Sequence, residues 1–190
     1  MTYRPHMLTQ LGKTPCARRN CGVCCAGMAA DRARKGVDPK NKYAWPPTAG
    51  DIRRQISGTW CRPTTLEDCK RAVKALYGVD MTIRYNISRA DFRSLLVSGR
   101  GAHMMIRYSV IHGTKFDASP NFYGNHGIYV NERRSDGFYL VYDPLADGRR
   151  AGIPKGPQWW PGNLLYAAGQ AFPGTNADHV HASFTRDTEA

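Results

Sequence analysis

The stretch that decides the fold of this chain is Gly124-Asn125-His126-Gly127-Ile128-Tyr129-Val130, followed at 138–144 by Phe-Tyr-Leu-Val-Tyr-Asp-Pro. Residues 127–131 and 138–142 are rich in apolar, β-branched and aromatic side chains, which predicts two strands. The Asp136-Gly137 pair between them is typical of a tight hairpin. Because a hairpin returns the chain to its starting point, we expect His126 and Asp143 to lie side by side at one end of the two strands.

A long helix is predicted over residues 20–34. Asn20 is a favourable N-cap residue, and Gly36 and Pro39 are typical of a chain leaving a helix. Apolar side chains recur within the segment at helical spacing and form one stripe: Cys21, Cys24, Cys25 and Met28.

The position of Cys21 at the first turn of this helix suggests a chemical role. Unpaired amides and the helix dipole lower the pKa of a thiol there, and the thiolate is the reactive form. Taken alone, Cys21 is more simply explained as a small buried hydrophobic residue, His126 as a loop residue and Asp143 as a turn former. Taken together, the three residues predict a nucleophile, a general base and a carboxylate that orients the base.

The remaining elements follow an α+β order, with helices first and antiparallel strands later. Capping boxes are predicted at Thr64/Glu67 and Ser88/Asp91. Further helices are expected at 51–56 (ended by Gly58), at 64–77, at 88–98 and at 163–168, and strands at 79–85 and 102–111. We expect a single domain over 1–190, with its core at about 14–170 and a polar C-terminal tail at 173–190.

The bulk composition limits the class of protein. The chain has 190 residues and a formal net charge of +12, from 27 basic and 15 acidic residues. Such a surface favours anionic partners, but the basic residues form no run of five or more, so a nucleic-acid-binding tail is not expected. No stretch has the length of a membrane span, and residues 1–10 lack the apolar region of a secretory signal.

The cysteines leave two further interpretations open. A domain of this length does not need disulfides, so a framework of three is not expected from the six cysteines. A zinc-binding nucleic-acid module is an alternative, although paired Cys-x2-Cys knuckles are absent. Its ligands would come from Cys16, Cys21, Cys24, Cys61 and Cys69.

Other candidate residues carry weaker signals. His103 falls in the buried-strand pattern and is interpreted as a core residue with satisfied hydrogen bonds, while His179 and His181 are interpreted as solvated. Asn125 precedes the histidine that opens the strand, and Trp159 and Trp160 follow a Pro/Gly-rich loop. These last three are candidates for the wall of a substrate cleft, and a surface pair covered by the C-terminal tail is an equal explanation for the tryptophans.

Three motifs together resemble the papain-like peptidases that process bacteriocin leaders. They are Asn20-Cys21-Gly22 at a helix start, Gly124 to Val130 at a strand start, and Leu140 to Leu145 around Asp-Pro. The resemblance covers about Thr14 to Gln170. It implies a papain-like fold, with an N-terminal nucleophile helix packed on an antiparallel sheet, and a Cys21–His126–Asp143 mechanism that needs no metal or other cofactor.

The sequence departs from that family in three ways. The family carries an oxyanion glutamine about five or six residues before its cysteine, where this chain has Pro15 and Cys16. Gln10 is the nearest glutamine, so the resemblance assigns the oxyanion role to Gln10 and to the Cys21 amide, provided that the intervening loop bulges. In addition, Cys24 and Cys25 replace small apolar residues, and no transporter is attached.

The resemblance also implies a setting. Stand-alone domains of this kind resemble those of actinobacterial phages, which implies protein or cell-wall cleavage at the phage tail or in lysis, in the virion or the host cytoplasm. The substrate would be a peptide or peptidoglycan, and other tail proteins would be partners. Two alternatives stay open: an inactive domain serving as a structural virion component, and a peptidoglycan amidase, whose strand motif also resembles His-x-Gly-Ile-Tyr.

Overall fold

The computed structural model describes residues 3–10, 16, 19–35, 47–56, 61–149 and 151–185. The helices in these ranges are α1 (Cys21–Arg34), α2 (Ala49–Gln55), α3 (Leu66–Tyr77), α4 (Arg89–Val97), α5 (Gly162–Gln170) and the short 3-10 helix η2 (Tyr108–Ile111). The strands are β1 (Met81–Ser88), β2 (Gly101–Arg107), β3 (Asn125–Arg133), β4 (Phe138–Tyr142), β5 (Gln158–Pro161) and β6 (His179–Thr185). Three expected helix stops lie outside these ranges: Gly36, Pro39 and Gly58. Pro15, at the position of the family's oxyanion glutamine, also lies outside them.

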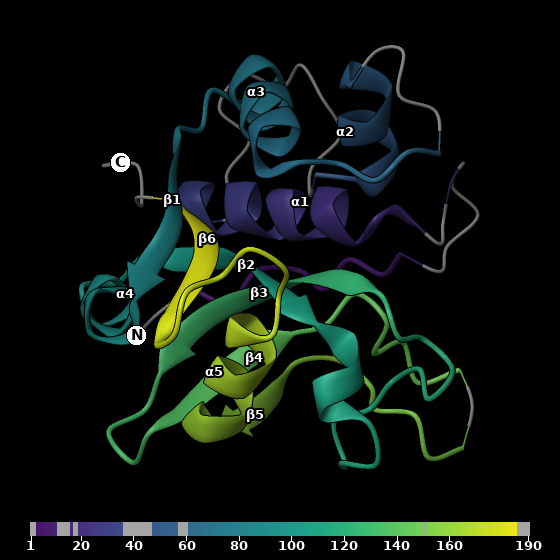
Figure 1. Cartoon of the computed structure of the whole chain (residues 1–190). Coiled ribbons are helices and arrows are strands. Elements are labelled where there is room, and N and C mark those ends of the chain that lie inside the picture. The colour runs from purple at the N-terminus through teal and green to yellow at the C-terminus, as the bar shows by residue number, and fades with distance from the viewer. Residues whose placement is uncertain are drawn as a thin grey trace.

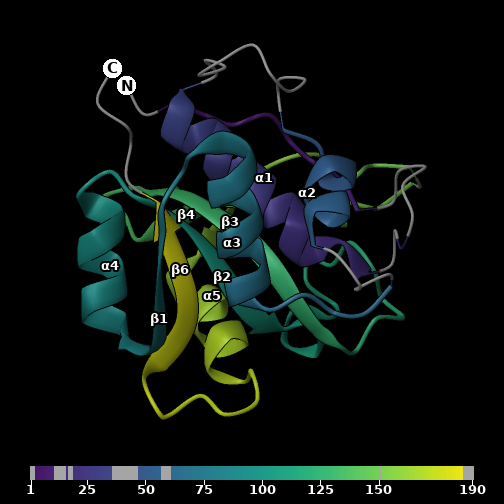
Figure 2. The ribbon, with the colours of Figure 1, turned by 90° about the horizontal axis from the view of Figure 1, so that it is seen from above.

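All six strands join one antiparallel sheet in the order β1-β6-β2-β3-β4-β5. Helices α1, α2 and α3 cover one face, with α1 lying directly on the sheet, and α5 lies against the other face (Figure 1). Figure 2 shows the same layers from above, with α1 and α3 crossing over the strands. The sheet therefore separates two hydrophobic cores, which share the strands as their common wall.

Helix α1 is more deeply buried than the apolar stripe predicted. Its buried residues run almost without a break from Gly22 to Ala33, because α2 and α3 pack on the side away from the sheet. Two buried charges on the helix are compensated. Arg32 donates to the backbone oxygen and the side chain of Asn131 at 3.0 and 2.8 Å, and Asp31 accepts from the His6 amide at 2.6 Å.

The capping predictions were partly wrong. Helix α3 begins one residue later than expected, and its capping box is formed by Thr65 and Asp68 instead of Thr64 and Glu67. Thr64 instead hydrogen-bonds to the buried Cys69 thiol. At α4 the Ser88 hydroxyl accepts from the Asp91 amide at 3.1 Å, which confirms that N-cap.

The hairpin prediction was correct, and both strands lie close to the expected bounds. β3 is longer at each end, and its pairing with β4 contains a bulge between Val130 and Glu132. The turn closes with a 2.8 Å bond from the Arg134 amide to the Phe138 oxygen, and Gly137 adopts a positive φ of 89° that suits glycine. The expected buried strand over 102–111 ends at Arg107 and continues as η2.

The C-terminal prediction was wrong. Residues 179–185 form β6, which lies between β1 and β2, one strand in from the edge of the sheet, and is buried along nearly its whole length. His181, Ser183 and Thr185 are among its buried residues, so the core extends well beyond residue 170. Among the described residues, no helix is long and apolar enough to cross a membrane.

Candidate active site

Cys21 is the first residue of α1 and is partly exposed in a cleft. The first intrahelical bond runs from the Cys24 amide to the Asn20 oxygen at 2.9 Å, so the amides before Cys24 have no partner within the helix. They place the positive end of the helix dipole beside the Cys21 sulfur. This is the local geometry that the sequence predicted for a reactive thiol.

Arg53 of α2 anchors the chain just before Cys21. Its guanidinium donates to the Asn20 Oδ1 at 3.0 Å and to the Arg19 oxygen at 2.7 Å. Asn20 is the N-cap residue, but its side chain makes no capping bond to the helix. Its carboxamide is used to fix the helix start to α2, a different role from the predicted one.

Gly22 is needed for packing inside the protein. A Cβ atom there would lie 2.5 Å from the Thr64 Oγ1 and 3.5 Å from the Cys69 Sγ. The glycine lets the start of α3 approach α1 closely.

His126 and Asp143 lie together, as the hairpin predicted. The His126 Nε2 is 2.7 Å from the Asp143 Oδ1, and both side chains are buried. Asp143 is fixed in turn by the Leu145 amide, which donates to Oδ1 at 2.9 Å, and by the Tyr108 hydroxyl, which donates to Oδ2 at 3.3 Å. The carboxylate therefore has a defined orientation before any substrate binds.

The other ring nitrogen, His126 Nδ1, is buried, and no ordinary hydrogen bond engages it among the described residues. The imidazole and the Cys21 thiol also interact with each other. Burial raises the pKa of the Cys21 thiol, but the His126 contact and charge and the amides of Gly127 and Gly22 outweigh it and leave that pKa lowered. Burial lowers the pKa of His126, yet Asp143 and Cys21 more than offset it, so that pKa is raised.

These opposite shifts favour a thiolate–imidazolium pair at neutral pH. The thiols of Cys24, Cys25 and Cys69 behave differently, because burial raises the pKa of each, that of Cys69 to about 12. Among the four free cysteines, Cys21 alone is partly exposed and has a lowered pKa.

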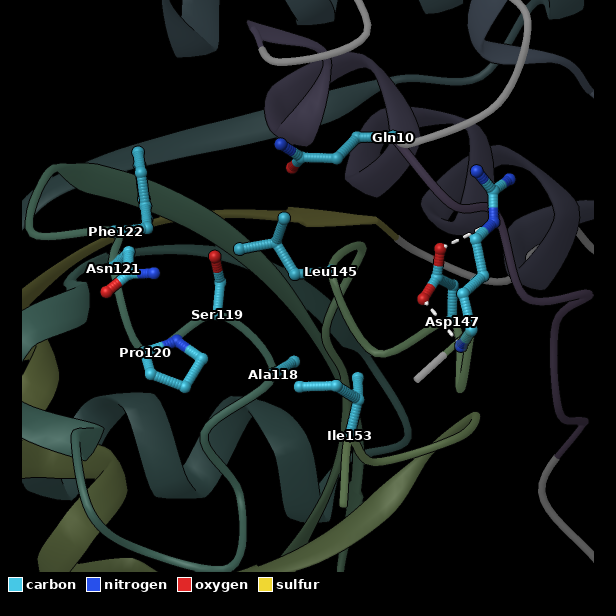
Figure 3. A pocket seen from close by; sticks show the side chains of 10 residues that line it. Gln10, Ala118, Ser119, Pro120, Asn121, Phe122, Leu145, Asp147 and Ile153 are labelled. Atoms are coloured by element: carbon cyan, nitrogen blue, oxygen red, sulfur yellow. Dashed lines mark hydrogen bonds and ion pairs between the residues drawn. The ribbon is translucent and has the colours of Figure 1, made fainter. Parts of the chain in front are cut away.

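Gln10 reaches the same site from the N-terminal segment. It is buried, and its backbone amide donates to the Pro144 oxygen at 3.0 Å, which ties it to the chain just after Asp143. Its side chain borders two hollows, one of which also contains Cys21. Figure 3 shows Gln10 across the second hollow from Ser119 and Pro120, above Leu145. Gln10 and Cys21 therefore border the same hollow, although they are separated in the sequence.

The two hollows form the two arms of a cleft that meet at Gln10 and Phe122. The arm beside Cys21 has a volume of about 620 Å³ and is bordered by Asn125, as predicted, and by Met105 and Phe172. The other arm has a volume of about 630 Å³ and runs along residues 118–121 toward Ile153. The two arms therefore form one continuous concave surface beside the thiol.

The predicted tryptophans lie elsewhere. Both belong to β5. Trp160 is only 1% exposed and packs against Phe116 in the core. The Arg134 guanidinium lies over the ring of Trp159. Neither borders the arms of the cleft. The pair is explained by the alternation of side chains along β5: Trp160 belongs to one hydrophobic core, and Trp159 packs against the other, on the opposite face of the sheet.

Sequence reasoning missed Tyr108, whose ring packs edge-on against His126 with centroids 5.1 Å apart. Besides donating to Asp143, its hydroxyl accepts from the Ala118 amide at 2.9 Å. The residue lies in η2, within the segment for which the sequence pattern predicts the end of a strand. A prediction that β2 ends at Arg107 would have placed Tyr108 at the end of the strand, where a side chain can reach the site.

His103 lies directly behind the site, and its outcome is mixed. It is buried as expected, but neither ring nitrogen has a hydrogen-bond partner among the described residues. Its Nε2 fills the space above Gly127, where a Cβ atom would come within 2.8 Å. Burial and the charge of His126 lower the pKa of His103 to about 3, so the ring is neutral.

The zinc interpretation is not supported. Cys16 and Cys61 are joined in a disulfide, which removes two of the five suggested ligands, and Cys24 and Cys69 are buried on helix faces. Within the described ranges, no group of three or more His, Cys, Asp or Glu residues gathers to hold a metal ion. His181 is buried on β6, so it is not the solvated residue that the sequence suggested.

The comparisons with known proteins support the fold. The sequence matches no known protein family, and no curated protein matches it. Among solved structures, it is similar to one from Bacillus anthracis that is provisionally described as a C39-like peptidase, with 11% identity and a TM-score of 0.54. The match covers 97% of this chain and 96% of that one. The expected α+β architecture is thus confirmed, and the protein has a papain-like fold.

Proposed function

We propose that the protein is a papain-like cysteine hydrolase that cleaves a peptide or cell-wall amide bond. In this proposal Cys21 is the nucleophile, His126 the general base and acid, and Asp143 the residue that orients the histidine. The observation that carries it is the His126 ring, whose Nε2 lies 2.7 Å from the Asp143 Oδ1 and whose interaction and charge lower the pKa of the Cys21 thiol.

The proposed reaction has two stages. The Cys21 thiolate attacks the carbonyl carbon to form a C–S bond, and the carbonyl π electrons move to the oxygen. As this oxyanion collapses, the C–N bond breaks and His126 gives its proton to the departing amine. Water then attacks the thioester, His126 accepts the proton of that water, and the acid product leaves as the thiolate is restored.

Gln10 and the backbone amide of Cys21 are the proposed donors to the oxyanion. Support comes from the placement of Gln10 at the junction of the two arms and from the amides at the start of α1, which have no partner within the helix. Donors that are fixed in advance stabilise the developing negative charge without reorganisation. Asn125, at the rim beside Cys21, is proposed to contact the substrate.

Covalent trapping tests this function. The purified protein is treated with a thiol-reactive peptidyl probe, and the labelled residue is identified by peptide mapping. In parallel, purified peptidoglycan and a peptide library are digested, with Cys21→Ala as the inactive reference. Labelling at Cys21 and cleavage of one substrate class are expected; if neither occurs, the structural role replaces the enzymatic one.

The setting that we infer is a phage tail or phage lysis, on the strength of the family resemblance and of the +12 charge, which suits an acidic cell-wall polymer. Neighbouring genes test it directly. Tail-protein or holin genes beside this one would support the setting, and a transporter gene would point to leader processing instead. Release of new peptidoglycan fragments would distinguish cell-wall cleavage from cleavage of a protein.

A further inference from the structure

Three arginines converge on one hollow at the end of β3 opposite His126. Arg133 is the last residue of that strand, and Arg89 and Arg93 come from the first two turns of α4. The hollow has a volume of about 410 Å³ and shares no residue with the cleft. Seven residues along the strand separate His126 from Arg133, which corresponds to about 23 Å at roughly 3.3 Å per residue.

The charges around this hollow are unbalanced. No carboxylate lines it among the described residues. Arg89 forms one exposed ion pair, at 3.4 Å, with Asp178, whereas no described carboxylate pairs with Arg93 or Arg133. The Arg133 Nε is buried and lacks an acceptor among the described residues. The charges that carry the inference are those of the three guanidinium groups as a whole, because no described carboxylate in the hollow balances them and an anion would.

Two tyrosine rings hold the guanidinium groups in place. The Arg89 Cζ lies 4.4 Å from the centroid of the Tyr166 ring, and the Arg133 Cζ lies 5.9 Å from that of Tyr139. The two tyrosine hydroxyls hydrogen-bond to each other at 2.7 Å, which fixes both rings. Stacking engages the flat face of a guanidinium and leaves the N–H groups in its plane free to donate.

The first turn of α5 borders the same hollow through Gly162 and Asn163. Its N-cap residue, Pro161, makes no side-chain capping bond. The amides of this turn therefore add a partial positive charge to that of the arginines. The helix start contributes to the site only because the three arginines already surround it.

We propose that this hollow binds a phosphate group, either free or as a phosphate ester. Guanidinium groups match the oxygens of phosphate with pairs of parallel hydrogen bonds, and three cations suit a dianion better than a single carboxylate. The hollow is larger than a phosphate ion, which leaves room for an ester substituent. The inference does not depend on the proposed hydrolase activity, because it uses different residues in a different place.

Titration with inorganic phosphate at constant ionic strength tests the proposal. The signals of the arginine Nε–H groups and of the Asn163 amide are followed by NMR, with chloride as the reference salt. We expect saturable shifts with phosphate that chloride does not produce. Arg93→Gln and Arg133→Gln should each weaken binding at least about tenfold, because each removes one of the two unpaired cations.

Arg134→Gln is the matched control, because Arg134 is exposed, adjacent in sequence and already paired with Asp136. It should change phosphate binding less than about twofold, as expected for a surface charge outside the site. Phenyl phosphate separates the two sources: tighter binding than that of inorganic phosphate identifies an ester ligand, and equal or weaker binding identifies the free ion. Equal responses to chloride and phosphate, or an equal loss in Arg134→Gln and Arg93→Gln, would overturn the proposal.

Discussion

The two ends of strand β3 use charge in opposite ways. At the His126 end, the imidazole, Asp143 and Cys21 are matched with one another, and the Tyr108 hydroxyl and the Leu145 amide complete the set. At the Arg133 end, two cations have no described carboxylate beside them. Groups that perform chemistry must be oriented before the substrate arrives, whereas groups that bind an anion must keep their donors free.

The largest expected effect comes from breaking the matched end. His126→Ala should lower the rate of hydrolysis by about 10,000-fold or more, because the thiol loses its base and the departing amine loses its proton donor. The rate is measured on the substrate class found by the digestion experiment, with circular dichroism as a check on folding. His179→Ala, at the start of β6 and outside the cleft, is the control. A loss of less than tenfold in His126→Ala would contradict the catalytic assignment.

Thiol reactivity should separate the cysteines almost as strongly. At neutral pH, limiting iodoacetamide is expected to label Cys21 at least about 1,000-fold faster than Cys69, because each pKa unit changes the thiolate fraction tenfold and burial adds to this. The rate at Cys21 should fall at acid pH, where the thiolate becomes protonated. Hydrolysis should also fall at alkaline pH, where His126 loses the proton needed by the departing amine. Preferential labelling of Cys24 or Cys69 would argue against the nucleophile.

Gln10→Ala tests the oxyanion role and should cost about 100- to 1,000-fold in kcat, with little change in KM, because the donor acts on the oxyanion and not on the bound substrate. Gln55→Ala is a suitable control, since Gln55 is an exposed residue of α2 that borders neither arm of the cleft. Full activity in the Gln10 variant would remove Gln10 from the site.

The comparison also shows why some of the site could be predicted from the sequence. His126 and Asp143 belong to one hairpin, so a strand pattern, a turn signal and Asp-Pro were enough to bring them together. Cys21 followed from a helix start. These signals are local, and each reports on a few neighbouring residues whose geometry is determined by the backbone period.

The missed features depend on contacts between distant segments. β6 contains His, Ser and Thr residues that resemble a solvated tail, yet pairing with β1 and β2 on either side buries it. Strand preference depends strongly on such context. Gln10 belongs to no helix or strand, so no periodic pattern of the sequence predicts its position. Its backbone amide is instead bonded to the Pro144 oxygen, far along the chain. The Cys16–Cys61 disulfide likewise joins segments 45 residues apart.

A smaller effect is expected where the matched end is only loosened. Tyr108→Phe keeps the ring against His126 but removes the hydroxyl that donates to Asp143 and accepts from the Ala118 amide. At about 1 kcal/mol for such a bond, the rate should fall about fivefold. Tyr123→Phe, at an exposed position, should leave the rate unchanged. If both variants behave alike, the hydroxyl does not help to orient Asp143.

The smallest expected effect is an absence of coupling between the two ends. Saturating inorganic phosphate should change the rate of hydrolysis by less than about twofold. Coupling between distant sites requires an element that has two conformations, and the paired strands between the two ends show one. By reciprocity, alkylating Cys21 should leave phosphate affinity at the Arg133 end equally unchanged. Both are measured at constant ionic strength, with Arg93→Gln as the variant that lacks phosphate binding. A phosphate-dependent rate in the parent protein that disappears in Arg93→Gln would mean that the two ends are coupled. Phosphate bound by the arginines at the Arg133 end would then affect the residues at the His126 end.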